Sequence, residues 1–212
     1  LKLFTFDPIA EQITQVDDTL SGDTINKVSW SPDGTYIAVV GGLTPENLQI
    51  YRIDITTNSL LFVDQDQASA AFYRAVAWSP NGQFIITNDE FGNTFLYSFN
   101  YQDESLLLLS SFSLGVTASD FSWSADGHYI ALAGSSAGDC LRIFYFDALN
   151  YSLTLIASDH QGTISAPQTL LLTGNWSPDG TYIVSGGAEF TTDQLFVNTA
   201  LEFPSKNIIT NN

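Results

Sequence analysis

Short apolar runs alternate with polar, glycine-containing segments along the whole chain, and no stretch shows the periodicity of an amphipathic helix. One set of runs is apolar on consecutive positions and rich in β-branched and aromatic residues; it covers 36–40, 84–86, 129–133 and 182–184. Such runs are typical of strands covered on both faces, because strands with one solvated face alternate apolar and polar residues. The pattern therefore predicts an all-β protein whose sheets stack face to face.

The same five-residue phrase precedes each of these runs and contains all four tryptophans of the chain. It reads Trp-Ser-Pro-Asp-Gly at Trp30 and Trp176, with Asn in fourth place after Trp78 and Ala in third place after Trp123. Pro presets φ for a turn, Asp or Asn bonds to nearby backbone and Gly takes the left-handed conformation, so we expect a tight β-hairpin at each copy. The copies begin 48, 45 and 53 residues apart, which indicates a repeat architecture.

Two further strand-like segments follow each copy at similar offsets. The third segment of the unit lies at 48–54, 95–100 and 141–147, and the fourth at 59–63, 105–109 and 152–156. Each unit is therefore predicted to be a four-stranded antiparallel meander of about 45 to 50 residues.

Units of this length, with a Trp-Ser-Pro-Asp-Gly hairpin between their first two strands, resemble the blades of β-propellers of the WD-repeat and TolB types. The segment 50–60 is also similar to the outer strands of lactonase-type propellers. Two WD-repeat features are missing: no Trp-Asp ends the third strand, and no Gly-His pair separates the blades. The resemblance implies one β-propeller domain of four-stranded antiparallel blades over 1–212, without the hydrogen-bond network of WD repeats.

The repeat divides the chain into a half blade at 1–26, blades at 27–74, 75–119 and 120–173, and a partial blade at 174–212. About four blades are thus present, and two arrangements follow. Either the last unit completes the first and closes a four-bladed ring, or the chain is an arc of a larger propeller that a second copy or another chain completes. A third-strand candidate at 194–197 makes ring closure redundant, and the absence of Met indicates a trimmed chain. We therefore expect the arc.

The composition is acidic because basic residues are scarce: 6 Lys plus Arg stand against 23 Asp plus Glu, and the net charge is −17. Phosphate contacts need Lys and Arg, so we expect no nucleic-acid partner. No apolar run of about 18 residues occurs, so we expect no membrane insertion. The expected partner is a protein or a second copy of the chain. The Thr-, Ser- and Asn-rich composition favours an exported protein only weakly, and the compartment stays open.

No residues form a recognisable catalytic or metal-binding pattern. The segment 134–138 fits Gly-x-Ser-x-Gly, but that chemistry needs a strand–turn–helix elbow, and here the segment links two strands. His128 and His160 lack the paired spacing of zinc ligands, and Cys140 is predicted to be a small buried hydrophobe. We therefore expect no catalytic residue, no cofactor and no metal, and the protein is predicted not to be an enzyme.

Two alternatives remain open: a lactonase-like or sugar-processing enzyme, and a propeller that binds glycans or other ligands. The enzyme would need polar side chains that converge on the central channel from several first strands. The residues at the starts of these strands are uneven: Asn26 and Lys27, Arg74, Asp120, and Gly174.

The loops that differ between the units are the best candidates for binding, because variable loops on a rigid scaffold carry function. They lead into the first strands (65–74, 113–119 and 158–173) or join the second and third strands (41–47, 88–93, 134–139 and 186–193). In a propeller all of them lie on one face. The candidate partner contacts are Phe72, Tyr73 and Arg74, with an acidic, aromatic rim of Glu90, Phe91, Glu189 and Phe190. The alternative is that Phe72 packs beneath its own loop.

These features predict a non-catalytic scaffold that mediates protein–protein interaction or assembly through this face. The leucine run at 106–109 is predicted to be the outer strand of its blade. Its alternate members should be covered by a neighbouring blade or partner, because an exposed apolar edge strand invites aggregation.

Overall fold

The computed structural model describes residues 1–19, 23–43, 46–66, 68–135, 139–160, 170–188 and 193–199. Within these residues the regular structure consists of β-strands alone, and neighbouring strands pair antiparallel. The prediction of an all-β chain built of four-stranded antiparallel units is confirmed.

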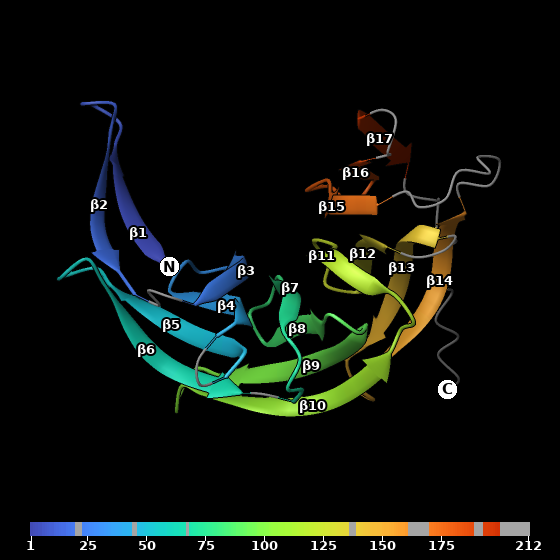
Figure 1. Cartoon of the computed structure of the whole chain (residues 1–212), viewed down its shortest axis with the longest axis horizontal. Helices are drawn as coiled ribbons and strands as arrows, with labels where there is room; N and C mark the ends of the chain where they lie inside the picture. The colour runs from blue at the N-terminus through green and yellow to red at the C-terminus, as the bar shows by residue number, and fades with distance from the viewer. Residues whose placement is uncertain are drawn as a thin grey trace, which may run out of the picture.

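The strands form successive meanders that we name by their order along the chain (Figure 1). The half-blade contains β1 (Lys2–Asp7) and β2 (Gln12–Asp18). The first blade contains β3 (Thr24–Trp30), β4 (Tyr36–Gly42), β5 (Leu48–Asp54) and β6 (Ser59–Asp66). The second blade contains β7 (Tyr73–Trp78), β8 (Phe84–Asp89), β9 (Asn93–Asn100) and β10 (Ser105–Ser113). The third blade contains β11 (Thr117–Trp123), β12 (Tyr129–Ser135), β13 (Asp139–Asp147) and β14 (Ser152–His160). The last unit contains β15 (Leu170–Trp176), β16 (Tyr182–Ala188) and β17 (Asp193–Thr199).

Neighbouring units meet mainly through the first strand of each unit, β3, β7, β11 and β15, whereas the outer strands β6 and β10 touch only slightly. Sheets that meet closely at one edge and spread apart at the other are arranged radially. The first strands are therefore the inner strands. Figure 1 shows the sheets side by side along an open arc, with β1–β2 at one end and β15–β17 at the other.

The sheets do not close into a ring within the described residues. β16 pairs with β15 on one edge and with β17 on the other, so it offers no edge to β1, which pairs with β2. The expected arc is confirmed, and the four-bladed ring is not formed. One residue pair, Ser135 with Leu170, joins the third blade to the last unit. The predicted strand at 194–197 is part of β17, and the segment 201–212 lies outside the described residues.

Each Trp-Ser-Pro-Asp-Gly phrase forms the expected hairpin, which hydrogen bonds of its serine side chain stabilise. In the second blade the Ser79 hydroxyl donates to Asn81 Oδ1 at 2.7 Å and accepts from the Phe84 amide at 2.9 Å. Gly82 follows with φ of 73°, in the left-handed region. The same bonds recur at Ser31, Ser124 and Ser177. The phrase therefore fixes the end of the first strand against the start of the second.

The core lies between the blades. β8 is buried throughout, and β4 is buried up to its last residue. Trp78 and Trp123 are buried and pack edge-on against Phe99 and Phe146, with ring centroids 5.4 and 5.2 Å apart. Trp30 is half exposed, because the described part of the half-blade consists of β1 and β2 and these do not cover it. The stacking of apolar faces thus stabilises the blades, by about 2 to 3 kcal/mol for each large side chain buried.

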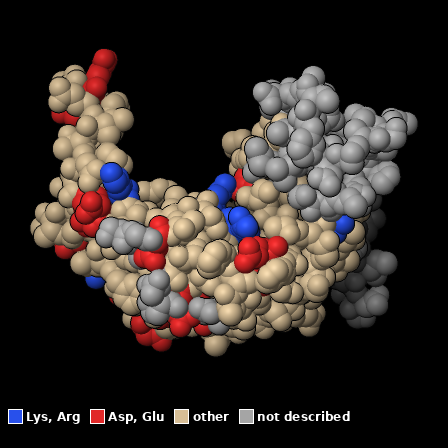
Figure 2. Space-filling model, in the orientation of Figure 1, with Lys and Arg blue, Asp and Glu red and all other residues tan. Residues whose placement is uncertain are grey.

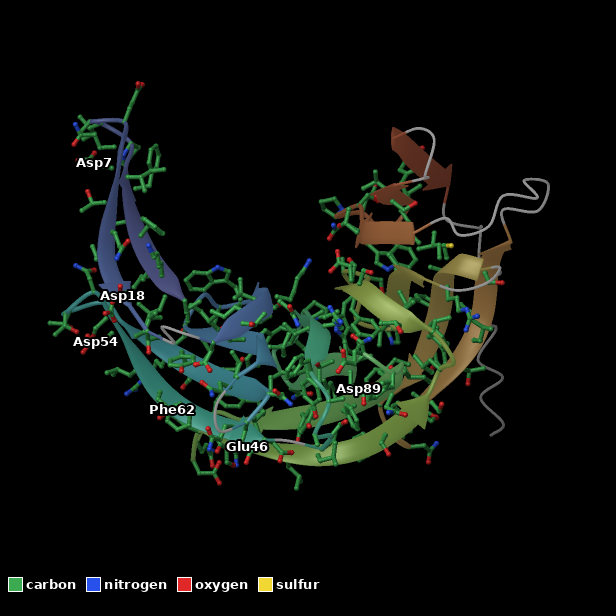
Figure 3. The ribbon with its side chains drawn as sticks, viewed as in Figure 1. Asp7, Asp18, Glu46, Asp54, Phe62 and Asp89 are labelled. Atoms are coloured by element: carbon green, nitrogen blue, oxygen red, sulfur yellow. The ribbon has the colours of Figure 1, made fainter. Side chains whose placement is uncertain are left out.

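Each outer strand contains a β-bulge at the same place. The register skips one residue in each, namely Val16, Val63, Leu109 and Ile156. A bulge changes which face the following side chains occupy. Leu106 packs on the cluster between the first and second blades and Leu109 on the cluster between the second and third, whereas Leu107 and Leu108 are exposed. Neighbouring blades thus do not cover either alternate pair of leucines completely, and coverage by a partner stays a prediction. Phe62, next to the bulge of β6, is exposed in the same way (Figure 3).

Candidate functional site

Four of the predicted contact residues meet on the second blade, at the end opposite the Trp-Ser-Pro-Asp-Gly turns. The Glu90 amide donates to the Phe72 carbonyl oxygen at 3.0 Å, and Arg74 Nη2 lies 3.2 Å from Glu90 Oε2. Phe72 is 53% exposed and Phe91 is 76% exposed. We name these four residues, Phe72, Arg74, Glu90 and Phe91, the long-loop surface. It presents two aromatic rings beside an exposed ion pair.

Tyr73 is a correction to the predicted contacts, because it is fully buried. Its ring stacks on Phe95 at 5.5 Å, and its hydroxyl oxygen accepts from the amides of Ala68 and Ser69 at 2.9 and 3.2 Å. Burial raises the pKa of the Tyr73 hydroxyl, so it stays neutral over the physiological range. Tyr73 therefore anchors the loop that leads into β7 from a buried position and presents no exposed surface.

The buried carboxylate of Asp89 holds the loop that carries Glu90 and Phe91. Asp89 Oδ1 accepts from the amides of Phe91 and Asn93, both at 2.9 Å, and Oδ2 accepts from Ser69 Oγ and Asn93 Nδ2, both at 2.8 Å. Asp89 lies in the middle of the arc (Figure 3). It ties the loop before β7 to the loop after β8, which fixes the two halves of the long-loop surface relative to each other.

Sequence reasoning missed Asp89, although a signal was present. The first and third blades have Gly41 and Gly134 at this place in the second strand. A Cβ on either glycine would lie 1.9 or 2.3 Å from a carbonyl oxygen of the preceding strand. The second blade therefore departs from its neighbours by placing a carboxylate where they need glycine.

Phe72 does not lie beneath its own loop. Its ring packs over Gly42 of the first blade, where an added Cβ would come within 3.0 Å of the ring, and its other side is exposed. The alternative of a Phe72 packed under its loop is therefore wrong. Glu189 and Phe190 lie outside the described residues.

A hollow of about 310 Å³ shares Ser69 and Asn93 with the Asp89 network. Phe95, Ser111, Phe112 and Ser113 also line it. A small recess therefore lies next to the loop that carries Phe91.

A second cluster of polar side chains lies on the inner strands. Its members, Lys27, Asp120 and Thr173, occupy the same position in three different units. Lys27 Nζ of β3 lies 2.9 Å from Asp120 Oδ1 of β11, although the second blade stands between these strands. Asp120 Oδ2 also accepts from Thr173 Oγ1 of β15 at 2.8 Å. Two of the residues that the sequence places at the starts of the first strands are thus brought together. Lys27 and Asp120 pair with each other across the inner edge of the arc.

The remaining candidates are isolated from one another. His128 is exposed, and its Nδ1 lies 3.2 Å from Asp126 Oδ2. Cys140 is buried, as predicted. In the part of the chain that the structure describes, no three His, Cys, Asp or Glu residues cluster closely enough to hold a metal ion. The segment 136–138 lies outside that part.

Among the described residues, no helix has the length and apolar character that crossing a membrane requires. Figure 2 shows few Lys and Arg residues on the visible face of the arc, and carboxylates spread over it. The charged surface thus agrees with the acidic composition.

Comparison with solved structures defines the class of protein as a β-propeller. The chain resembles the periplasmic gluconolactonase PpgL of Pseudomonas aeruginosa with a TM-score of 0.63 and 19% identity, over 92% of this chain and 61% of that one. It resembles TolB of Acinetobacter baumannii with a TM-score of 0.58 and 21% identity, over 93% and 48% of the two chains. It resembles Chaetomium thermophilum Sqt1, bound to the N-terminus of a ribosomal protein, with a TM-score of 0.58 and 20% identity, over 77% and 43%.

The resemblance to WD-repeat, TolB-type and lactonase-type propellers is thereby confirmed, and the chain spans less than two thirds of each of these proteins. Residues 2–147 match the family of eukaryotic translation initiation factor eIF2A. The chain belongs to this family. No curated protein matches the chain in sequence.

Proposed function

We propose that this propeller is a non-catalytic scaffold that binds a protein partner through the long-loop surface. The observation that carries the proposal is the exposure of Phe72 and Phe91 above a backbone that buried Asp89 holds in place. Aromatic anchors dominate the energetics of protein interfaces. A loop that is already ordered loses little conformational entropy when a partner binds. Arg74 and Glu90 supply the polar rim.

The partner we propose is a protein of the translation apparatus that presents a cationic, extended segment. Three observations support this chemistry. The family is named after a translation initiation factor, and Sqt1, which has a similar fold, is bound to the N-terminus of a ribosomal protein. The net charge of −17 would also attract a basic segment and speed its association.

Site-specific photo-cross-linking tests the proposal. A benzophenone amino acid in place of Phe91 should yield one main adduct in extract of the source cells, and mass spectrometry should place the link in a Lys- and Arg-rich peptide. Adding Phe72→Ala to this variant should reduce the yield. Ile55 is the matched control, since it is 84% exposed in the turn after β5, on the opposite face. Equal adducts at 91 and 55, or none at 91, would contradict the proposal.

The lactonase alternative has one observation in its favour, the Lys27–Asp120 pair on the inner strands of a lactonase-like fold. The pair neutralises itself, which supports a structural role. Hydrolysis of δ-gluconolactone by the purified protein decides between the two. Activity above the uncatalysed rate that disappears in Asp120→Asn, with an unchanged unfolding curve, would replace the scaffold by an enzyme.

A further inference from the structure

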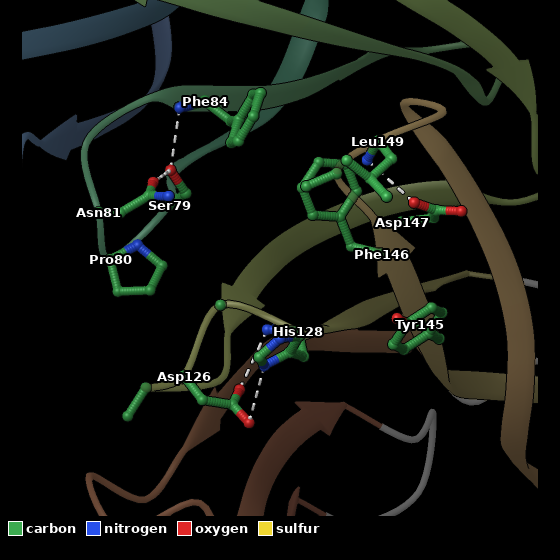
Figure 4. Close-up of a pocket in the computed structure, with 13 residues that line it drawn as sticks. Ser79, Pro80, Asn81, Phe84, Asp126, His128, Tyr145, Phe146, Asp147 and Leu149 are labelled. Carbon is green, nitrogen blue, oxygen red and sulfur yellow. Dashed lines mark hydrogen bonds and ion pairs between the residues drawn. The ribbon is translucent and has the colours of Figure 1, made fainter. Parts of the chain in front are cut away.

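A cleft of about 450 Å³ opens on the face opposite the long-loop surface, between the second and third blades. It is lined by the turn at 79–81, the turn at 125–128 and the hairpin at 145–149 (Figure 4). Figure 4 shows Pro80, Phe84, Phe146 and His128 around the space. The cleft is therefore built from turns that recur in every blade. A residue that differs between the blades must explain why it is open here.

The equivalent space between the first and second blades is closed by the ring of Tyr101. This ring packs edge-on against Tyr36 at 5.4 Å and against Phe99 at 5.1 Å. It also reaches the neighbouring turn, because a Cβ added to Gly82 would lie 2.4 Å from the Tyr101 hydroxyl oxygen. Three aromatic rings thus fill this interface.

The open cleft keeps two of the three rings. Phe84 and Phe146 stand where Tyr36 and Phe99 do, with centroids 5.1 Å apart against 4.9 Å in the first pair. The third ring is missing, because Ala148 follows β13 at the place where Tyr101 follows β9. Tyr151 contacts Phe84 at 6.2 Å but is not part of the lining of the cleft. The cleft therefore opens at the place where Tyr101 packs in the first interface.

The polar wall of the cleft also suits a phenol. In the filled space, burial and then the negative charge of Asp33 raise the pKa of the Tyr101 hydroxyl. In the open cleft the residue equivalent to Asp33 is Asn81, a neutral side chain that both donates and accepts hydrogen bonds. A phenol hydroxyl beside Asn81 would meet a hydrogen-bonding partner, and the carboxylates of Asp126 and Asp147 also line the cleft. Asp126 and His128 form its polar mouth.

We propose that this cleft binds a tyrosine-type aromatic side chain that a partner protein presents to it. In the equivalent space the ring of Tyr101 packs against Tyr36 and Phe99, whose counterparts in the cleft are Phe84 and Phe146. Tyr101 therefore shows which kind of side chain fits. An aromatic ring gains most when it packs edge-on against other rings in a preformed pocket. The site lies on the other face from the long-loop surface and does not depend on the function proposed there.

Titration with 4-methylphenol, the tyrosine side chain without its backbone, tests the proposal by amide NMR. In the unmodified protein the shifts should saturate and should centre on Asn81, Gly127 and Ala148. Ala148→Tyr supplies the missing ring from within and should weaken binding at least about tenfold. Ile55→Tyr is the matched control, because Ile55 holds the same turn position in the first blade, where it is exposed. It should leave binding unchanged.

Tyr101→Ala gives a second, independent test because it empties the filled space. It should create a second set of saturating shifts around Gly82 and Asp33. Unchanged binding by a folded Ala148→Tyr protein would overturn the proposal. Binding by the Tyr101→Ala protein at the new space alone would overturn it as well, because the natural cleft would then be shown not to accept the ring.

Discussion

The two faces of the arc differ in how closely the blades agree. On the turn face, four serines make the same two hydrogen bonds in four units: Ser31, Ser79, Ser124 and Ser177. On the loop face, one place near the end of the second strand holds Gly41, Asp89 or Gly134, and the side chains around it differ from blade to blade. Repetition thus marks the residues that build a blade, and departure from it marks residues free to take on a function.

The same lesson holds within the turn face. The cleft on this face arises at Ala148, where the second blade has Tyr101 and the first blade has Ile55. A single substitution in a repeated scaffold can therefore create a site without changing the architecture, because the neighbouring blades hold the walls in place.

The largest effect is expected from the buried carboxylate of the loop face. Asp89→Ala removes the acceptor of four hydrogen bonds and leaves their donors without partners. Buried unpaired polar groups are costly, so the free energy of unfolding should fall by about 3 kcal/mol in urea denaturation. A loss below about 1 kcal/mol would mean that the loop does not depend on Asp89.

The repeated serines should have smaller and equal effects. Ser31→Ala, Ser79→Ala and Ser124→Ala each remove the same pair of bonds and should each lower the free energy of unfolding by about 1 to 2 kcal/mol. The urea midpoint of each variant measures this. Costs that differ widely between the three positions would break the claim that the turn face is uniform.

Acid should act on three of the four turns. Burial alone would raise the pKa of Asp33, but hydrogen bonds from Ser31 and Thr35 outweigh it, and the pKa lies below its ordinary value of 3.8. The pKa values of Asp126 and Asp179 are also lowered. A lowered folded-state pKa stabilises the fold above pH 3.8, and this stability is lost as the pH falls through the folded-state values.

The second blade supplies the control for this pH dependence, because it has the uncharged Asn81 at the same place. Asp33→Asn should therefore flatten the fall of the unfolding midpoint between about pH 5 and pH 2. Chemical denaturation at a series of pH values measures the slope. An unchanged slope would show that the turn carboxylates do not contribute to acid sensitivity.

The smallest effect on stability is expected on the long-loop surface. Phe72 and Phe91 are exposed, and neither belongs to the buried clusters between the blades. Phe91→Ala should change the free energy of unfolding by no more than about 0.5 kcal/mol, and Phe72→Ala by slightly more because its ring covers Gly42. Thermal or urea denaturation checks both values. A loss above about 2 kcal/mol at Phe91 would make it a structural residue.

The scaffold was predictable from the sequence because its chemistry is local. The Ser-Pro-Asp-Gly turns specify their hairpins within five residues, and the apolar second strands identify the stacked faces. The bulge at Leu109 could not be predicted, because it depends on the register between β9 and β10, which involves residues from both strands.

The site was predictable only in part. Phe72, Arg74, Glu90 and Phe91 were found because they lie in or directly after loops that differ between blades, and the structure brings them together. Tyr73 was misjudged because it was assigned to the loop at 65–74, whereas it is the first residue of β7 and is buried there. Neighbouring positions on a strand point to opposite faces, which separates Tyr73 from exposed Arg74. The cleft at Ala148 becomes visible only when two interfaces are compared in three dimensions.

Partner binding by the Phe72→Ala/Phe91→Ala double variant tests the central claim most directly. The protein cross-linked at position 91 would be purified, and its affinity would be measured for the unmodified chain and for the double variant. The account predicts a loss of at least about a hundredfold with an unchanged unfolding curve. Undiminished affinity in the folded double variant would contradict it, because Phe72 and Phe91 would then not contribute to partner binding.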